Sequence, residues 1–244
     1  MAYQRRTVIT RGGSAYIKCF HSMQFQSKCE TRRGRTKPTK ASVAEANRKA
    51  SLEKLTWELN ENFCIDDWWA TLTYREPLSK ARTYEEIKDD LRLFLRRMRN
   101  SCRKQGIEFK CKFSIEVGKK GARHIHMVMN RVDAALVRKA WTFGIADLRA
   151  VYPQTDKGTF DEIAAYMIKD SDKTRQVLGN DRIPRYSGTR NLRQPPIEIK
   201  PLLRDTFSAD KPFVPKGFRL VPDSMVENEN EYGYKTLEYI CLRC

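Results

Sequence analysis

The strongest constraint on the fold is an alternation of apolar and polar residues through residues 107–117, followed by a second alternating segment over 124–130. Alternation with a period of two is typical of a strand that buries one face. Between the two segments lies Gly118-Lys119-Lys120-Gly121, a sequence typical of a hairpin turn. We therefore predict two antiparallel strands joined by this turn.

The second strand carries two of the three histidines of the chain, His124 and His126, on one face. The apolar sides of the two strands coincide only when paired residue numbers add to an even sum, as with Ile115 opposite Ile125. Glu116 then lies on the histidine face, across from His124. Directly opposite Cβ atoms are about 4.5–5.5 Å apart, so His124, His126 and Glu116 could hold one divalent cation. An open site with nitrogen and oxygen ligands suits Mn²⁺ or Mg²⁺.

The same residues also have ordinary structural interpretations. A His-x-His pair can lie on the surface of any strand, and short motifs often match by chance. Glu116 could form a cross-strand salt bridge with Arg123 or Lys112 instead of binding a cation. The rest of the chain has to decide between these interpretations.

The charge of the chain favours a polyanionic partner. Lys and Arg exceed Asp and Glu by 17 (47 against 30), and residues 1–40 carry many basic side chains but a single acidic one, Glu30. Neutralising phosphates releases counterions and so drives binding to nucleic acid. A membrane surface is the weaker alternative, because no apolar stretch approaches about 18 residues. No signal-peptide pattern follows Met1, so we expect a cytoplasmic protein.

Other segments add helices and further strands to the hairpin. The expected ranges are 42–60, 84–105, 133–141 and 160–170 for helices, and 67–77 and 145–151 for strands. Ser42, with Glu45 three residues later, and Thr159 are the expected capping residues. The helix at 84–105 carries a basic outer side, which is either a solvated face or a DNA-contacting face. This order predicts an α+β fold with a central antiparallel β-sheet backed by helices.

The two ends of the chain carry weaker signals. We predict a basic N-terminal arm or flanking segment over 1–45, one domain over 46–195 and an irregular C-terminal extension over 196–244. An odd number of cysteines, seven, in a chain expected to be cytoplasmic argues against disulfides. The cysteines that could share a zinc ion are Cys19, Cys29, Cys241 and Cys244. Free thiols are the simpler interpretation, because their spacing fits no standard zinc finger.

Three segments resemble, in their order, the motifs of the HUH endonucleases, specifically the rolling-circle replication initiators of phages, plasmids and integrated elements. They are Ala70-Thr71-Leu72-Thr73-Tyr74, His124-Ile125-His126 and Tyr166-Met167-Ile168-Lys169. The resemblance covers roughly residues 45–195. It implies a sheet topology like that of an RNA-recognition domain.

The resemblance also implies a metal-dependent, site-specific single-stranded DNA endonuclease and strand transferase. A cation at His124, His126 and Glu116 would polarise the scissile phosphate. Tyr166 would attack it, leaving a 5′-phosphotyrosine bond and a free 3′-hydroxyl primer, and Lys169 would favour the phenolate or steady the phosphate. A purely structural interpretation gives the tyrosine a packing role with its hydroxyl in water and the lysine a role at the helix terminus.

The implied partners are single-stranded or hairpin origin DNA and a separate helicase and DNA polymerase of the host, because the chain has no G-x-x-x-x-G-K-[ST] phosphate loop. Some family members carry two tyrosines on the catalytic helix, whereas Tyr166 is alone here, which implies a single-tyrosine mechanism. Two alternatives remain open. One is a conjugative relaxase or single-tyrosine transposase with the same chemistry, and the other is a basic nucleic-acid-binding module without catalysis.

Overall fold

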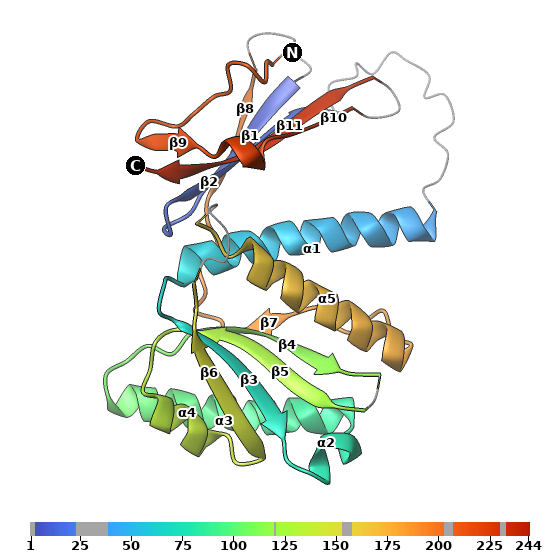
Figure 1. The fold of residues 1–244 in the computed structure, drawn as a ribbon, viewed down its shortest axis with the longest axis vertical. Coiled ribbons are helices and arrows are strands. Elements are labelled where there is room, and N and C mark those ends of the chain that lie inside the picture. The colour runs from blue at the N-terminus through green and yellow to red at the C-terminus, as the bar shows by residue number, and fades with distance from the viewer. Residues whose placement is uncertain (1–2, 23–38, 120, 153–157, 203–206, 230–232) are drawn as a thin grey trace. The chain divides into compact units, whose positions relative to one another are not determined.

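A computed structural model describes residues 3–22, 39–119, 121–152, 158–202, 207–229 and 233–244. This part of the chain forms two antiparallel sheets and five α-helices, which confirms the predicted α+β class (Figure 1). The chain divides into two compact units. The histidine unit is Ala50–Pro153 with Phe160–Arg193, and the terminal unit is Met1–Lys49 with Gln154–Thr159 and Gln194–Cys244.

The sheet of the histidine unit has five strands in the order β6-β3-β5-β4-β7, each antiparallel to its neighbour. Their bounds are Trp68–Tyr74 (β3), Cys111–Val117 (β4), Arg123–Met129 (β5), Gly144–Ala150 (β6) and Ser187–Gly188 (β7). The predicted hairpin and its register are confirmed. Ile115 lies opposite Ile125, and Glu116 lies opposite His124.

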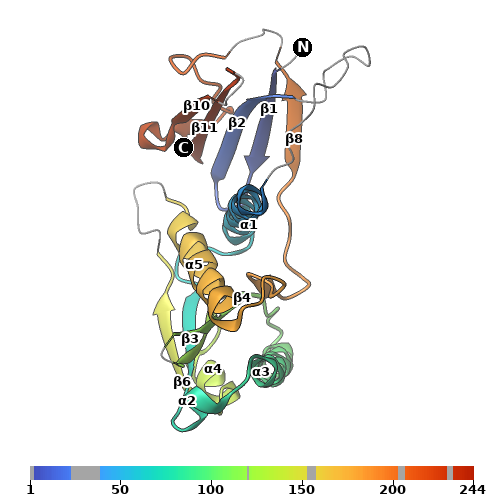
Figure 2. The ribbon, with the colours of Figure 1, turned by 90° about the vertical axis from the view of Figure 1, so that its right-hand side faces the viewer.

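Five helices accompany the strands of the described part of the chain. Their bounds are Lys40–Asn62 (α1), Leu78–Ala81 (α2), Tyr84–Lys104 (α3), Ala134–Ala140 (α4) and Asp161–Leu178 (α5). Helices α3 and α4 cover one face of the five-stranded sheet and α5 covers the other (Figure 2). No helix among the described residues is long and apolar enough to span a membrane.

The alternation along β5 explains why helices pack on both faces. Met127 is buried in one core cluster with Phe94 of α3, whereas its neighbour Val128 is buried in a second cluster with Ile163 and Met167 of α5. Successive side chains of a strand point to opposite faces. His126 is two residues before Val128 and shares its face, so the histidine face is the face that α5 covers.

Two of the predicted helix caps are wrong. The amide of Ser42 donates to Thr39 Oγ1 at 3.1 Å, so Thr39 caps α1 and Ser42 is already its third helical residue. At α5 the residue before the helix is Phe160, and Thr159 Oγ1 makes no hydrogen bond within the described residues. The amide of Phe160 donates instead to Asn60 Oδ1 at 3.3 Å, a side chain distant in sequence.

The sheet of the terminal unit joins both ends of the chain. Its order is β10-β11-β2-β1-β8, with β9 pairing β11. The bounds are Tyr3–Ile9 (β1), Ser14–His21 (β2), Ile197–Pro201 (β8), Phe218–Leu220 (β9), Val226–Glu229 (β10) and Lys235–Arg243 (β11). Cys19 lies opposite Leu237, and Arg5 lies opposite Lys200.

This sheet corrects the expectation of a basic arm over 1–45 and an irregular extension over 196–244. Strands from both segments pair with each other, although they are almost a whole chain apart. Strand preference depends strongly on the neighbouring strand, so a short strand with a distant partner has a weak local pattern. The remainder of the expected arm, residues 23–38, lies outside the described residues.

The sheet separates two of the cysteines that could have shared a zinc ion. Cys19 lies opposite Leu237 and Cys241 lies opposite Ala15. The two thiols are therefore four positions apart along their strands, roughly 13 Å at about 3.3 Å per residue. Burial raises the pKa of both thiols, that of Cys241 to about 11. Free thiols therefore remain the better account of Cys19 and Cys241, while Cys29 lies outside the described residues.

A close approach at the start of β6 gives a stability prediction. A Cβ atom at Gly144 would lie 2.0 Å from the carbonyl oxygen of Thr73 and 2.8 Å from the amide nitrogen of Arg75. We expect Gly144→Ala to lower the free energy of unfolding by about 3 kcal/mol, because backbone atoms of a paired strand cannot move aside cheaply. Chemical denaturation of both proteins measures the change.

Gly118→Ala is the matched control. The nearest atom to a Cβ at Gly118 is the carbonyl oxygen of Ala122 at 3.5 Å, an ordinary van der Waals contact. This variant should stay within about 1 kcal/mol of the natural protein. Equal losses in the two variants would contradict the close packing of Gly144 against β3.

Candidate metal centre

Three side chains with metal-binding atoms meet where β4, β5 and α5 adjoin. Glu116, His126 and Asp170, here called the Glu-His-Asp cluster, each offer one ligand atom, and these atoms lie within 4.8 Å of one another. His126 Nε2 is 2.9 Å from Glu116 Oε2 and 3.5 Å from Asp170 Oδ2. His126 and Asp170 are buried and Glu116 is half-buried.

Strand register and one bridging hydroxyl position the cluster. The alternation of β4 and β5 puts Glu116 and His126 on the same face. Thr174 of α5 ties the helix to this edge: its Oγ1 donates to the carbonyl oxygen of Ile115 at 2.9 Å and accepts from the amide of Val117 at 2.9 Å. Asp170, one helical turn before Thr174, is thereby held over the two strand residues.

The neighbours of His126 on β3 fix the orientation of its ring. Thr71 Oγ1 lies 3.4 Å from His126 Nδ1. The indole of Trp69 is stacked on the imidazole, with 5.7 Å between ring centroids and 8° between planes. A partner at one ring nitrogen directs the other toward a ligand position, so Thr71 leaves Nε2 pointing into the cluster.

Tyr166 stands beside this cluster on α5. Its ring is edge-on to His126, with centroids 5.2 Å apart, and edge-on to Trp69 at 5.8 Å. The side chain is 45% exposed, so solvent and a ligand can reach it. Burial raises the pKa of its phenol, and the negative charges of Asp170 and Glu116 raise it further. The phenol therefore keeps its proton at neutral pH.

The two lysines of α5 differ in their contacts. Lys173 Nζ is 2.7 Å from Asp170 Oδ1 and 3.6 Å from Glu116 Oε1. Its hydrogen bond to Asp170 raises the pKa of its ammonium group, and the hydrogen bond with His126 lowers the pKa of Glu116. Lys169 is exposed and is not part of this ion-pair network. Lys173, not Lys169, balances the charge of the two carboxylates.

His124 lies next to the cluster but is not one of its members. Its ring centroid is 6.2 Å from that of His126, and burial lowers the pKa of its imidazole. His124 Nδ1, Asp170 Oδ2 and Ser114 Oγ are buried without a hydrogen bond to any described residue. Ser114 is paired opposite His126 on the same face. Buried polar atoms are nearly always satisfied, so these three atoms are candidates for contact with a bound ligand.

The predicted site residues are thus only partly brought together. Glu116 and His126 are in contact and Tyr166 adjoins them, whereas His124 lies beside the cluster and Lys169 is exposed to solvent. The two salt bridges considered for Glu116 do not form. Lys112 pairs with Glu58, and the Arg123 guanidinium donates to backbone carbonyl oxygens.

Sequence reasoning missed two residues of the site, Asp170 and Lys173. The signal that could have found them is helical spacing, because Asp170 follows Tyr166 by four residues and Lys173 follows Asp170 by three. Such neighbours share a helix face. The predicted helix ended at residue 170, whereas α5 continues to Leu178.

One comparison with known proteins found a matching family. The sequence model of a family described as replication-associated protein ORF2/gene II protein matches residues 67–175. The matched segment contains β3 to β6 and nearly all of α5, and so includes every residue of the cluster as well as Tyr166 and Lys173. No curated protein and no solved structure matched the chain.

Proposed function

We propose that the chain initiates rolling-circle replication by nicking single-stranded origin DNA, because residues 67–175 match the sequence model of the replication-associated protein family of the ORF2/gene II type. The observation that carries this proposal is the position of Tyr166, whose ring lies 5.2 Å from that of His126 in a cluster with two carboxylates. A nucleophile and a cation-binding group are the two parts that cleavage of a phosphodiester by this route requires.

We propose that Glu116, His126 and Asp170 hold Mn²⁺ or Mg²⁺, with His124 as a further ligand. In octahedral coordination with bonds of about 2.1 Å, adjacent ligand atoms are about 3 Å apart. The separations of 2.9 Å and 3.5 Å around His126 Nε2 fit that requirement. His124 Nδ1, which has no hydrogen bond to a described residue, supplies a further donor.

The chemical nature of these donors also fits the proposal. Two carboxylates with imidazole nitrogens suit Mn²⁺ or Mg²⁺, whereas thiolates would suit zinc. When bound, the cation would supply Lewis-acid polarisation of the scissile phosphate. Thr71 and Trp69 would keep the imidazole of His126 in its binding orientation, since both already contact that ring.

Tyr166 would carry out the covalent step. Its phenolic oxygen attacks the phosphorus, and the bond from phosphorus to the 3′-oxygen breaks. The phenolic proton is released, the 3′-oxygen takes up a proton, and the products are a 5′-phosphotyrosine and a free 3′-hydroxyl. Trp69 supports the side of the tyrosine ring, and the partial exposure of that ring leaves room for the incoming strand.

The two lysines would take different parts. Lys169 is exposed on α5, three residues after Tyr166, so its ammonium group is available to steady a phosphate of the bound strand. Lys173 is engaged by Asp170 and Glu116 and would keep both carboxylates oriented. We propose that the endonuclease domain comprises residues 46–195, that a host helicase unwinds the duplex, and that a host DNA polymerase extends the 3′-hydroxyl primer.

The replication-associated family match supports this role over a conjugative relaxase or a transposase with the same chemistry. The alternative of a non-catalytic nucleic-acid-binding module has less support, because such a module needs no tyrosine beside a cluster of metal-binding side chains.

The test is covalent adduct formation on DNA of different forms. The full chain is incubated with Mn²⁺ and circular single-stranded DNA, and denaturing gels with mass spectrometry locate the adduct. We expect the adduct on Tyr166 with single-stranded and hairpin DNA and little with relaxed linear duplex of the same sequence, because displacing each paired base costs a few kcal/mol. Cleavage of the relaxed duplex at the same rate would contradict the proposed substrate.

A further inference from the structure

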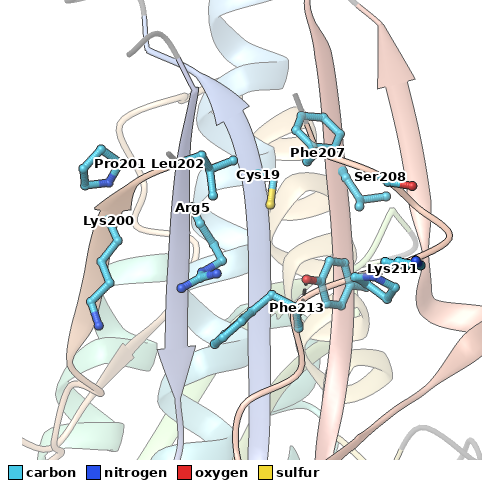
Figure 3. A pocket seen from close by; sticks show the side chains of 12 residues that line it. Arg5, Cys19, Lys200, Pro201, Leu202, Phe207, Ser208, Lys211 and Phe213 are labelled. Atoms are coloured by element: carbon cyan, nitrogen blue, oxygen red, sulfur yellow. Dashed lines mark hydrogen bonds between the residues drawn. The ribbon is translucent and has the colours of Figure 1, made fainter. Parts of the chain in front are cut away.

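The terminal unit contains a cavity that the nicking proposal does not use. Its volume is about 510 Å³, within the range of about 300–1,000 Å³ typical of ligand pockets. It lies over one face of the sheet, between β8, β1, β2 and β11 and the segment 207–213 (Figure 3). The lining residues used below are Arg5, Lys200, Phe207, Lys211, Phe213 and Tyr239.

The lining combines positive charge with aromatic rings. Arg5, Lys200 and Lys211 are basic, and none of the described residues that line the cavity is acidic. The guanidinium carbon of Arg5 lies 3.4 Å from the centre of the Phe213 ring, and its Nε is buried without a hydrogen bond to a described residue. Lys200 already pairs with Glu198 at 2.8 Å, which leaves Arg5 and the exposed Lys211 for a ligand.

Contacts with Tyr239 and Tyr3 fix the two phenylalanines that line the cavity, Phe213 and Phe207. The hydroxyl of Tyr239 donates to the carbonyl oxygen of Phe213 at 2.8 Å. Phe213 is 40% exposed although it is apolar. The ring of Phe207 is fixed edge-on against Tyr3, with centroids 5.5 Å apart. A fixed, exposed ring beside available cationic groups can accept a planar base that carries a phosphate.

We propose that this cavity binds one nucleotide of a single DNA strand, with its phosphate on Arg5 and Lys211 and its base against Phe207 and Phe213. The proposal rests on the proposed function, because it assigns a second contact to the same DNA. A base can enter a cavity only when it is unstacked from its neighbours, so the site selects single-stranded over duplex DNA. An acidic peptide would match the charge but would not use the two rings in this way.

Binding of a fluorescein-labelled 12-residue oligothymidylate to the full chain tests the proposal. Fluorescence anisotropy in EDTA measures affinity without cleavage. We expect Lys211→Ala and Phe213→Leu each to weaken binding by about fivefold or more, because one aromatic or charged contact to a nucleotide has effects of this size. Lys211 is exposed, so its replacement should leave the fold intact even if Phe213→Leu does not.

Lys216→Ala is the matched control, since Lys216 is exposed in the same unit and lies outside the cavity lining. It removes the same charge and should change affinity less than twofold. Equal losses of oligothymidylate affinity in Lys211→Ala and Lys216→Ala would overturn the proposal. So would a loss of affinity of Lys211→Ala for a 12-base-pair duplex as large as its loss for the oligothymidylate. Crosslinking of a bromodeoxyuridine-containing oligonucleotide to the peptide that contains Phe213 would support it.

A single-turnover assay separates this proposal from the proposed function. The natural protein is assayed for the Tyr166 adduct on a short hairpin, in parallel with the binding measurements on Lys211→Ala. If the natural protein forms no adduct while Lys211→Ala still weakens binding, nicking is wrong and the nucleotide site stands. If the adduct forms but Lys211→Ala binds the oligothymidylate normally, nicking stands and the nucleotide site is wrong.

Discussion

Tyr166→Phe is expected to lower the nicking rate by at least about 10⁴-fold and to abolish the covalent adduct, because removal of a nucleophile has effects of this order. The substitution deletes only the hydroxyl. The ring contacts with His126 and Trp69 remain possible, so the fold should persist. DNA affinity should also persist, since it arises from many basic side chains. Single-turnover cleavage and filter binding measure the two quantities.

Tyr152→Phe is the matched control for this variant. Tyr152 is 56% exposed and its hydroxyl donates to Asp66 Oδ1 at 2.8 Å, away from the Glu-His-Asp cluster. Losing this hydroxyl should leave the nicking rate within about twofold of the natural protein, as for an exposed substitution. An adduct that still forms in Tyr166→Phe would show that another residue is the nucleophile.

His126→Ala is expected to reduce cleavage by at least about 100-fold, and EDTA should have the same effect on the natural protein. His126 is the member of the cluster within 3.5 Å of both carboxylates, so its loss removes the central donor. Calorimetric titration with Mn²⁺ measures affinity independently of cleavage. His21→Ala, which replaces the third histidine of the chain, should retain full activity.

Two further variants separate the possible ligand sets in the same titration. Asp170→Asn should weaken Mn²⁺ binding more than His124→Ala does, because Asp170 belongs to the cluster and His124 lies beside it. The opposite order would favour the set His124, His126 and Glu116 that the strand pattern alone suggested. Undiminished cleavage in EDTA would show that cleavage does not require a bound cation.

The sequence predicts the hairpin of β4 and β5, its register and the side chains that share each of its faces. A strand has a period of two, so the alternation around residues 111–129 determined which side chains share a face and which register joins them. The same alternation places Glu116 on the face of the histidines. Tyr166 was found from a motif and from its position at the edge of an apolar stripe on a helix.

Helix ends were less predictable because they depend on partners. Ser42 has the local pattern of a cap, yet Thr39 caps α1. Thr159 precedes an apolar stripe, yet the first amide of that region is satisfied by Asn60. A capping hydroxyl and a distant amide side chain satisfy the same donor, so the local sequence cannot tell which of them is used.

By itself the sequence determined the α+β class, the strand register and the common face of Glu116 and His126, because these follow from hydrophobic periodicity over a few neighbouring residues. Only the tertiary structure decided that Asp170 and Lys173 complete the site while His124 and Lys169 lie outside the cluster. It also decided that the two chain ends form one sheet. The physical reason is distance along the chain: a helix docked by Thr174 and strands paired across nearly the whole sequence depend on contacts that no local pattern contains.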